Sequence, residues 1–159
     1  MRQGRIFTTM LATTGAVALA LSSGAAAKPT KVTKLTCTLA LNAQGQPNPS
    51  GIHLGFASCS RPFGKGLHHN AYTVTPTSPG HGTVVAKFKN YYDRGTTRGT
   101  AELTFAASSP TNITYTGTVT YTGGTAAFRH VKGSGTITCT TTDGGAHKAC
   151  TVHSKLTGI

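Results

Sequence analysis

The sequence predicts an all-β protein built as a single antiparallel eight-stranded barrel, with a β-sandwich as the alternative. Apolar and polar residues alternate with a period of two, turn signals recur about every 8 to 15 residues, and 30 of the 159 residues are threonine. Threonine favours extended backbone because its side chain branches at Cβ. Alternation alone does not separate a barrel from a sandwich. Closure favours the barrel because it leaves no strand edge exposed.

The first 27 residues are typical of a secretory signal peptide. Arg2 and Arg5 form a positively charged start, residues 7–21 are mostly apolar, and small residues continue to Ala27. Threonines interrupt the apolar run, whereas a membrane anchor needs about 20 unbroken apolar residues. We therefore expect cleavage after Ala27, a secreted location, no transmembrane segment and one domain over residues 28–159.

The period-two alternation is clearest over residues 112–122. Ile113, Tyr115, Val119 and Tyr121 fall on one face there, and threonines fall on the other. The same pattern occurs at 35–41, 84–88, 101–105, 137–139 and 150–156. Breaks rich in turn-forming residues fall at 44–51, 60–70, 76–82, 93–97, 108–111, 123–127 and 144–147. This spacing predicts seven or eight antiparallel strands.

Four cysteines in an exported chain can form disulfides, and three pairings are possible. Cys139 and Cys150 are equidistant from a Gly-rich turn, so a hairpin folded there places them opposite each other. Cys37 and Cys59 flank a loop rich in Gly, Pro and Asn in the same manner. We therefore favour the pairs Cys37–Cys59 and Cys139–Cys150. A zinc site is not expected because the chain lacks any C-x-x-C pair.

The charge balance is strongly basic. The chain has 15 Lys and Arg against 3 Asp and Glu, and removal of residues 1–27 leaves 13 basic residues against the same three acidic ones. Three carboxylates are too few for most carboxylate-pair catalysis or for an all-oxygen metal cage. The basic surplus favours extracellular polyanions such as cell-wall polymers or acidic polysaccharide. Specific nucleic-acid binding is not expected, because no recognition module is present and aromatic residues are not interleaved with basic ones.

The seven histidines match no known metal-ligand spacing. His53, His68, His69 and His81 are interpreted as solvated loop residues, so no metal or other cofactor is expected. No serine or cysteine has a histidine and aspartate framework around it, and we therefore expect no catalytic residues. Asn112 begins a glycosylation sequon, which matters only where the source has that machinery.

Residues 121–135, YTGGTAAFRHVKGSG, resemble the G-G-[TA]-G-x-F-x-x-x-x-G signature of the allene oxide cyclases and dirigent proteins, which share an eight-stranded antiparallel barrel. Tyr91–Gly95 resembles the strand end and turn one hairpin earlier in those proteins. The resemblance covers roughly residues 84–142. Ala126 stands where the family has its third glycine, and alanine takes a positive φ less readily. We therefore expect a rebuilt turn at this point.

The motif has a structural interpretation. Gly123 and Gly124 permit a tight reversal, Phe128 plugs one end of the core, and Gly133 allows a bend of the kind that barrels need. The interpretation assigns no catalytic group to this segment.

The resemblance implies a functional site inside the barrel or at its mouth. Asp93 aligns with the family's aspartate, although a turn aspartate is the favoured interpretation. Tyr91 and Tyr92 alternate faces, so one of them points inward and, with Tyr115 and Tyr121, lines or fills a cavity. These five residues are the candidate ligand-binding residues.

Two functions are open from the sequence. The favoured one is a non-catalytic secreted barrel with a structural, surface-binding or small apolar-ligand-binding role. The alternative is a cyclase-like isomerase or a dirigent-like protein that acts on an oxidised lipid or a phenolic in the barrel cavity. The ligand and the oligomeric state do not follow from the sequence.

Overall fold

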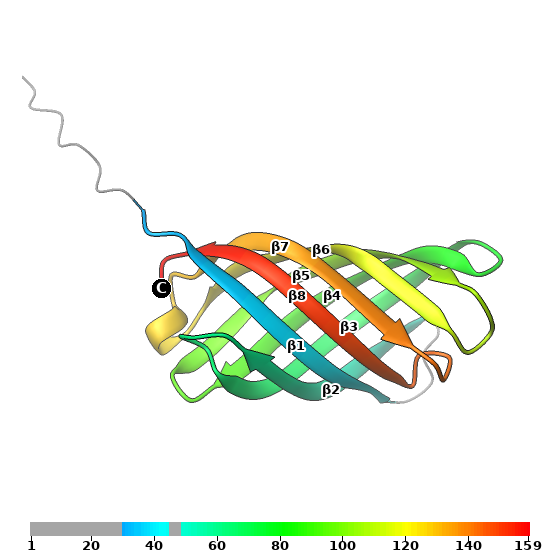
Figure 1. Cartoon of the computed structure of the whole chain (residues 1–159), viewed down its shortest axis with the longest axis horizontal. Helices are drawn as coiled ribbons and strands as arrows, with labels where there is room; N and C mark the ends of the chain where they lie inside the picture. Colours follow the sequence, from blue (N-terminus) through cyan, green and yellow to red (C-terminus); the bar gives the residue numbers. More distant parts are fainter. Residues whose placement is uncertain (1–29, 45–48) are drawn as a thin grey trace, which may run out of the picture.

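The computed structural model describes residues 30–44 and 49–159, so the predicted signal peptide lies outside the described residues. Each strand pairs antiparallel with the next, and the last pairs with the first to close the ring (Figure 1). The strands are β1 (Thr33–Gln44), β2 (Ser50–Cys59), β3 (Lys65–Ser78), β4 (His81–Tyr92), β5 (Gly95–Ala107), β6 (Ile113–Gly124), β7 (Lys132–Thr141) and β8 (His147–Thr157). A short 3-10 helix, η1 (Ala126–Phe128), joins β6 to β7. The predicted barrel is confirmed, and the sandwich alternative is excluded.

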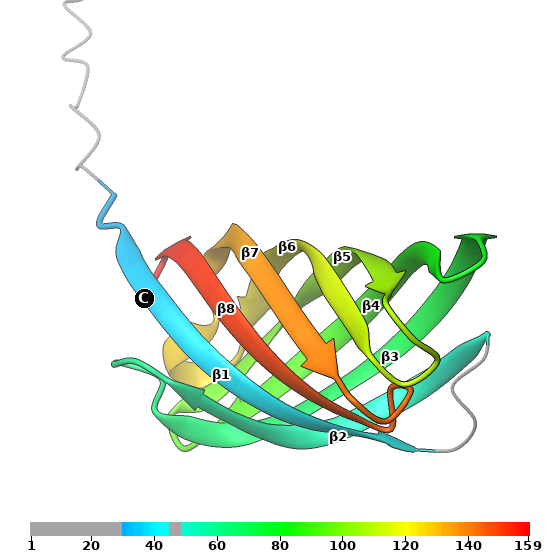
Figure 2. The same cartoon turned by 45° about the vertical axis from the view of Figure 1, so that its right-hand side comes forward.

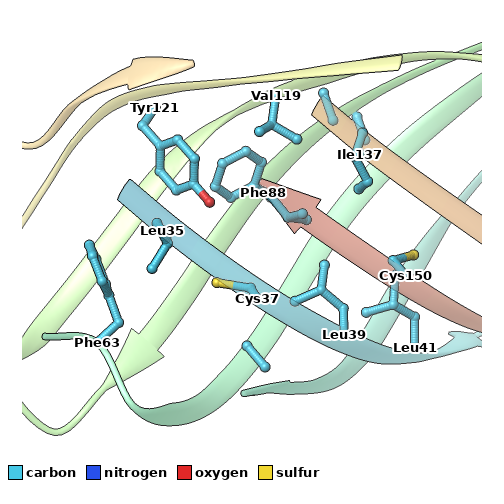
Figure 3. Packing of buried hydrophobic residues seen from close by; sticks show 14 of the residues in the cluster. Leu35, Cys37, Leu39, Leu41, Phe63, Phe88, Val119, Tyr121, Ile137 and Cys150 are labelled. Carbon is cyan, nitrogen blue, oxygen red and sulfur yellow. The ribbon is translucent and has the colours of Figure 1, made fainter. Parts of the chain in front are cut away.

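The period-two pattern explains how the wall separates core from solvent. In β4, every second residue from Val84 to Tyr92 is buried, and the residues between them are exposed. The core forms where these inward faces meet, as Figure 3 shows for side chains of β1, β4, β6, β7 and β8. In the part of the chain that the structure describes, no helix is long and apolar enough to cross a membrane.

Both predicted disulfides are confirmed. Cys37 lies directly opposite Cys59 in the β1–β2 pair, and Cys139 lies opposite Cys150 in the β7–β8 pair. Their sulfur atoms are bonded at 2.02 and 2.03 Å. Each disulfide therefore fixes the register of one hairpin.

One end of the barrel, here called the closed end, carries the β2–β3, β4–β5 and β6–β7 connections (Figure 2). Aromatic rings fill this end. Phe128, which is 0% exposed, stacks on Phe63 with ring centroids 4.5 Å apart. Tyr92 meets both rings edge-on, at 5.3 and 5.8 Å. These three side chains are called the plug, and offset or edge-on ring contacts of this kind are favourable beyond their buried area.

The β6–β7 connection brings Phe128 into the plug. Gly123 and Gly133 both have strongly positive φ, 146° and 144°, while Gly124 lies against the backbone of Thr96. Ala126 has φ of 49°, so this position keeps a left-handed backbone in spite of its Cβ. The lower readiness of alanine for a positive φ therefore does not prevent a left-handed backbone at this position. The left-handed conformation is kept because the chain on either side is anchored in β6 and in the plug.

Strands β2 and β3 invert the usual distribution of polar and apolar residues. His53, at 5% exposed, and His68, at 6%, point into the barrel together with Asn70, whereas Phe56 is 68% exposed on the outside. The structure corrects two sequence interpretations: the break predicted at 60–70 ends earlier because β3 begins at Lys65, and His53 and His68 are not solvated loop residues. The inward disulfide at Cys59 sets the parity of β2, so every second residue back from it faces the interior.

Candidate functional site: a cavity at the open end

The opposite end, here called the open end, carries the β3–β4, β5–β6 and β7–β8 connections and holds a cavity of about 280 Å³. Its walls are largely apolar, and the polar side chains that face it come from four different strands. The apolar lining includes Leu41, Val74, Val84, Leu103, Phe105, Ile113 and Ile137, and the polar lining consists of His53, Asn70, Tyr72, Tyr115 and Lys148. Apolar walls with a few convergent polar groups are typical of small-molecule sites, which hold about 300–1,000 Å³.

A continuous series of hydrogen bonds begins at this cavity and runs through the interior toward the plug. Lys148 Nζ, on β8, lies 2.6 Å from His53 Nε2 on β2, and His53 Nδ1 lies 2.9 Å from Asn70 Oδ1 on β3. We call the full set the polar line: Lys148, His53, Asn70, His68, Asn90 and Thr97. Its first three members come from three strands, and Lys148 is 95 residues away from His53 in the sequence.

The second half of the polar line crosses from β3 to β5. Asn70 Nδ2 lies 2.9 Å from His68 Nε2, and His68 Nδ1 lies 2.7 Å from Asn90 Oδ1 on β4. Asn90 Nδ2 then donates to the Thr97 hydroxyl over 3.1 Å, and Thr97 is 0% exposed. A buried polar group lowers the stability of the fold unless it is hydrogen-bonded. The side chains of the polar line bond to one another, which explains why the barrel interior tolerates them.

The donors in the polar line all point the same way. An amide Oδ1 only accepts, so the Nδ1 atoms of His53 and His68 carry the protons and donate to Asn70 and Asn90. Each imidazole Nε2 is then an acceptor, and it receives an N–H from Lys148 or from Asn70. Both histidines are therefore neutral Nδ1–H tautomers, and successive bonds in one direction polarise each other.

Burial sets the protonation of these groups. It lowers the pKa of His53 to about 4, with a further lowering by Lys148, and it lowers the pKa of His68 to about 4. Burial also lowers the pKa of Lys148 to about 8, against the opposing influence of Asp143. At neutral pH the two imidazoles are uncharged, and the lysine is still mostly an ammonium.

Lys148 is held at the rim of the cavity by several contacts. Its ammonium donates to the Gly145 carbonyl over 3.1 Å and lies over the rings of Tyr72 and Tyr115, 5.6 and 5.2 Å from their centroids. Gly145 has φ of 103°, and a Cβ there would lie 3.5 Å from the Tyr115 hydroxyl oxygen and 3.6 Å from Lys148 Nζ. The positive φ favours glycine at this position, and the lack of a side chain leaves the space between Lys148 and Tyr115 unfilled.

None of the three acidic side chains of the chain faces the cavity. Asp143 accepts from the Thr141 hydroxyl at 2.7 Å and pairs with His147 Nδ1 at 2.6 Å, and the His147 N–H that it also accepts holds the pKa of its carboxyl well below the usual range. Asp93 and Glu102 are exposed on the outside. Across residues 30–44 and 49–159, no group of three or more His, Cys, Asp or Glu residues is arranged to hold a metal ion.

The five candidate ligand-binding residues lie in different places. Tyr115 lines the open-end cavity, while Tyr92 belongs to the plug. Tyr121 packs edge-on against Phe88 in the core, where burial raises its pKa to about 12. Tyr91, 43% exposed, and Asp93, in the β4–β5 turn, line an open hollow on the outer surface. The structure therefore brings only one of the five, Tyr115, to the cavity.

Sequence reasoning missed His53, Asn70 and Lys148 as cavity residues. The predicted disulfides carried a signal that could have found two of them. Cys59 and Cys150 face inward, so His53, six residues before Cys59, and Lys148, two residues before Cys150, share that face. Asn70 has no such signal, because the polar run from His68 to Asn70 is typical of a loop.

The fold and the site together define a disulfide-linked antiparallel barrel that is plugged at one end and has a cavity at the other. No family model matches the sequence, and no curated protein sequence matches it. Among solved structures, this chain is similar to pyocyanin demethylase at 14% identity and a TM-score of 0.44, over 78% of this chain and 99% of that one. This similarity is too low to indicate a function, and the cavity is the feature from which a function can be inferred.

Proposed function

We propose that this protein is a secreted, non-catalytic barrel that binds a small, largely apolar ligand in the open-end cavity. The observation that carries the proposal is a cavity of about 280 Å³ with apolar walls and a few polar groups at its rim. The opposite end is packed by the plug, so a ligand would enter through the open end.

Export is part of this proposal. The signal-like residues 1–27, one domain over residues 28–159 and two disulfides are compatible with an oxidising, extracellular setting. The basic residues on the outside, among them Lys65, Lys87 and Lys89, support a weaker association with cell-wall polymers or acidic polysaccharide. Such association is electrostatic and weakens as salt rises.

We also infer kinship with the allene oxide cyclase and dirigent barrels. Support comes from the motif at 121–135, in which Phe128 enters the plug and Ala126 takes the left-handed backbone that the family's glycine would allow. A cyclase-like or dirigent-like activity on an oxidised lipid or phenolic is the second candidate function. The observation that favours it is the polar pair of His53 and Lys148 inside the cavity.

A cavity-filling variant tests the proposed function. The probe is 2-naphthylmethanol, a neutral aromatic alcohol, titrated by calorimetry into the disulfide-bonded protein. We expect saturable binding at one site, which Leu103→Trp abolishes because Leu103 lines the cavity. The matched control is Val85→Trp on the outer face of β4, where the wild-type side chain is 50% exposed.

The control is expected to bind like the wild type, and thermal melting checks that both variants are folded. If the wild type binds neither this alcohol nor the carboxylate of the same ring, 2-naphthoate, or if Val85→Trp weakens binding as much as Leu103→Trp does, the open-end cavity is not the binding site.

A further inference from the structure

The rim of the cavity holds a cation that is oriented by neutral groups. The Lys148 ammonium donates to the His53 imidazole at 2.6 Å and to the Gly145 carbonyl at 3.1 Å, and neither acceptor carries a negative charge. A carboxylate partner would both orient and neutralise a lysine. These two acceptors orient Lys148 and leave its charge uncompensated.

In the described part of the chain, no carboxylate contacts Lys148 directly, and Asp143 only favours its charged form from a distance. The three carboxylates of the protein are Asp93, Glu102 and Asp143. The first two are exposed on the outer surface, and the third is engaged with Thr141 and His147 in the β7–β8 turn. Charges in partly buried positions are usually paired, so a partly buried ammonium without a carboxylate indicates recognition of an anion from outside.

The polar line fixes the tautomer of His53, which accepts a hydrogen bond from Lys148. Because Asn70 Oδ1 accepts from His53 Nδ1, the lone pair of His53 lies on Nε2, toward the lysine. Asn70 is held in this orientation because its amide nitrogen donates to His68. The direction of the donors is thus fixed by groups deeper in the barrel.

An ammonium has three N–H donors, and the described residues accept from Lys148 at two places, His53 and the Gly145 carbonyl. The third N–H is available at the cavity, whose lining also includes the rings of Phe105, Tyr72 and Tyr115. Building on the proposed function, we propose that the ligand is an aromatic monoanion, a carboxylate or phenolate whose charged oxygen accepts from Lys148 while its ring lies against the apolar walls.

Two probes of matched shape separate this inference from the proposed function. They are 2-naphthoate, an anion, and 2-naphthylmethanol, its neutral counterpart, each titrated by calorimetry into the disulfide-bonded protein at pH 7. A hydrogen bond to a charged group favours the anion by about 10-fold or more in affinity. We expect Lys148→Met to remove most of this preference, measured as the ratio of the two affinities.

The matched control is Lys155→Met, on the outer face of the same strand. It removes the same unit of charge without touching the cavity, so it is expected to keep the preference for 2-naphthoate. Vesicles, polymers and other polyanions are left out of the buffer, so that only the two probes compete for the site.

A pH series on the unchanged protein gives an independent readout. The titratable groups around Lys148 are His53 on β2, Tyr72 on β3, Tyr115 on β6, Asp143 in the β7–β8 turn and His147 at the start of β8. Burial keeps His53 neutral and raises the pKa of both tyrosines, so Lys148 is the cavity group that loses charge as pH rises through about 8. The preference for 2-naphthoate is expected to fall between pH 7 and 9.5, with the alcohol unaffected.

The outcomes are distinct. If neither probe binds the wild type, the proposed function fails. If both probes bind with equal affinity, or if the preference survives in Lys148→Met and at pH 9.5, this inference is overturned while the proposed function stands.

Discussion

The two ends of the barrel differ in what fills them. At the closed end, Phe63, Tyr92 and Phe128 pack ring against ring. At the open end, the polar line ends at Lys148 beside a cavity of about 280 Å³. One wall of eight strands therefore encloses two kinds of interior: aromatic packing stabilises the barrel at one end, and hydrogen-bonded polar groups border a cavity at the other.

Acid is expected to act on the polar line with the largest effect. His53 and His68 have a pKa of about 4 when folded, against about 6.5 in the unfolded chain. The unfolded state therefore binds more protons between these values, and stability falls as pH drops from about 6.5 to about 4. The loss is on the order of 3 kcal/mol for each imidazole, measured by urea unfolding across this range.

His68→Gln is expected to remove about half of that pH dependence, since one of the two imidazoles is gone. His153→Gln, on the outer face of β8, is the control and leaves the pH dependence unchanged. A stability that stays constant between pH 6.5 and 4 contradicts the neutral, buried state of the two histidines.

Truncating one ring at each end tests the difference in packing. Phe128→Ala is expected to destabilise the barrel by about 3–5 kcal/mol, because Phe128 is fully buried against two other rings. Phe105→Ala is expected to cost less than half as much, because Phe105 is half-buried and faces the cavity. Equal losses in chemical denaturation would show that the open end is packed as tightly as the closed end.

The smallest expected effect concerns the turn that leads into the plug. Ala126→Gly relieves a left-handed backbone at φ of 49° and is expected to stabilise by about 1 kcal/mol, after the added freedom of glycine in the unfolded chain is subtracted. Ala127→Gly next to it gains no such relief and is expected to destabilise. Melting temperatures that move in the same direction for both variants would contradict the strain at Ala126.

Much of the fold could be predicted from the sequence, because alternation and hairpin symmetry are local properties. The strand at 112–122 alternates cleanly between apolar residues and threonines, and each cysteine pair is centred on a turn. Barrel closure was harder to predict from the sequence, because the pairing of β1 with β8 joins residues from opposite ends of the domain.

The candidate site was harder to predict, because β2 and β3 depart from the common rule. Ile52, Leu54 and Phe56 would be placed inside by their hydrophobicity, yet they are exposed, and the polar residue His53 is buried. A buried polar residue is satisfied only by partners that the folded barrel supplies, here Asn70 and Lys148. Those partners come from other strands, so no local pattern reveals them. The positive φ of Ala126 is a similar case, because flanking structure overrides the local preference of alanine.

The position of the two disulfides determines how the wall can open. One ties β1 to β2 and the other ties β7 to β8, and the pairing of β1 with β8 lies between these two covalently linked hairpins. While both disulfides are intact, strand separation at these two hairpins is restricted. Any separation of neighbouring strands in the oxidised barrel would therefore occur at a pairing without a disulfide, which means β1 with β8 or one of the pairings from β2–β3 to β6–β7. Reduction of the two disulfides would allow β1 to separate from β2 and β7 from β8 as well, so that every strand pairing in the ring could open.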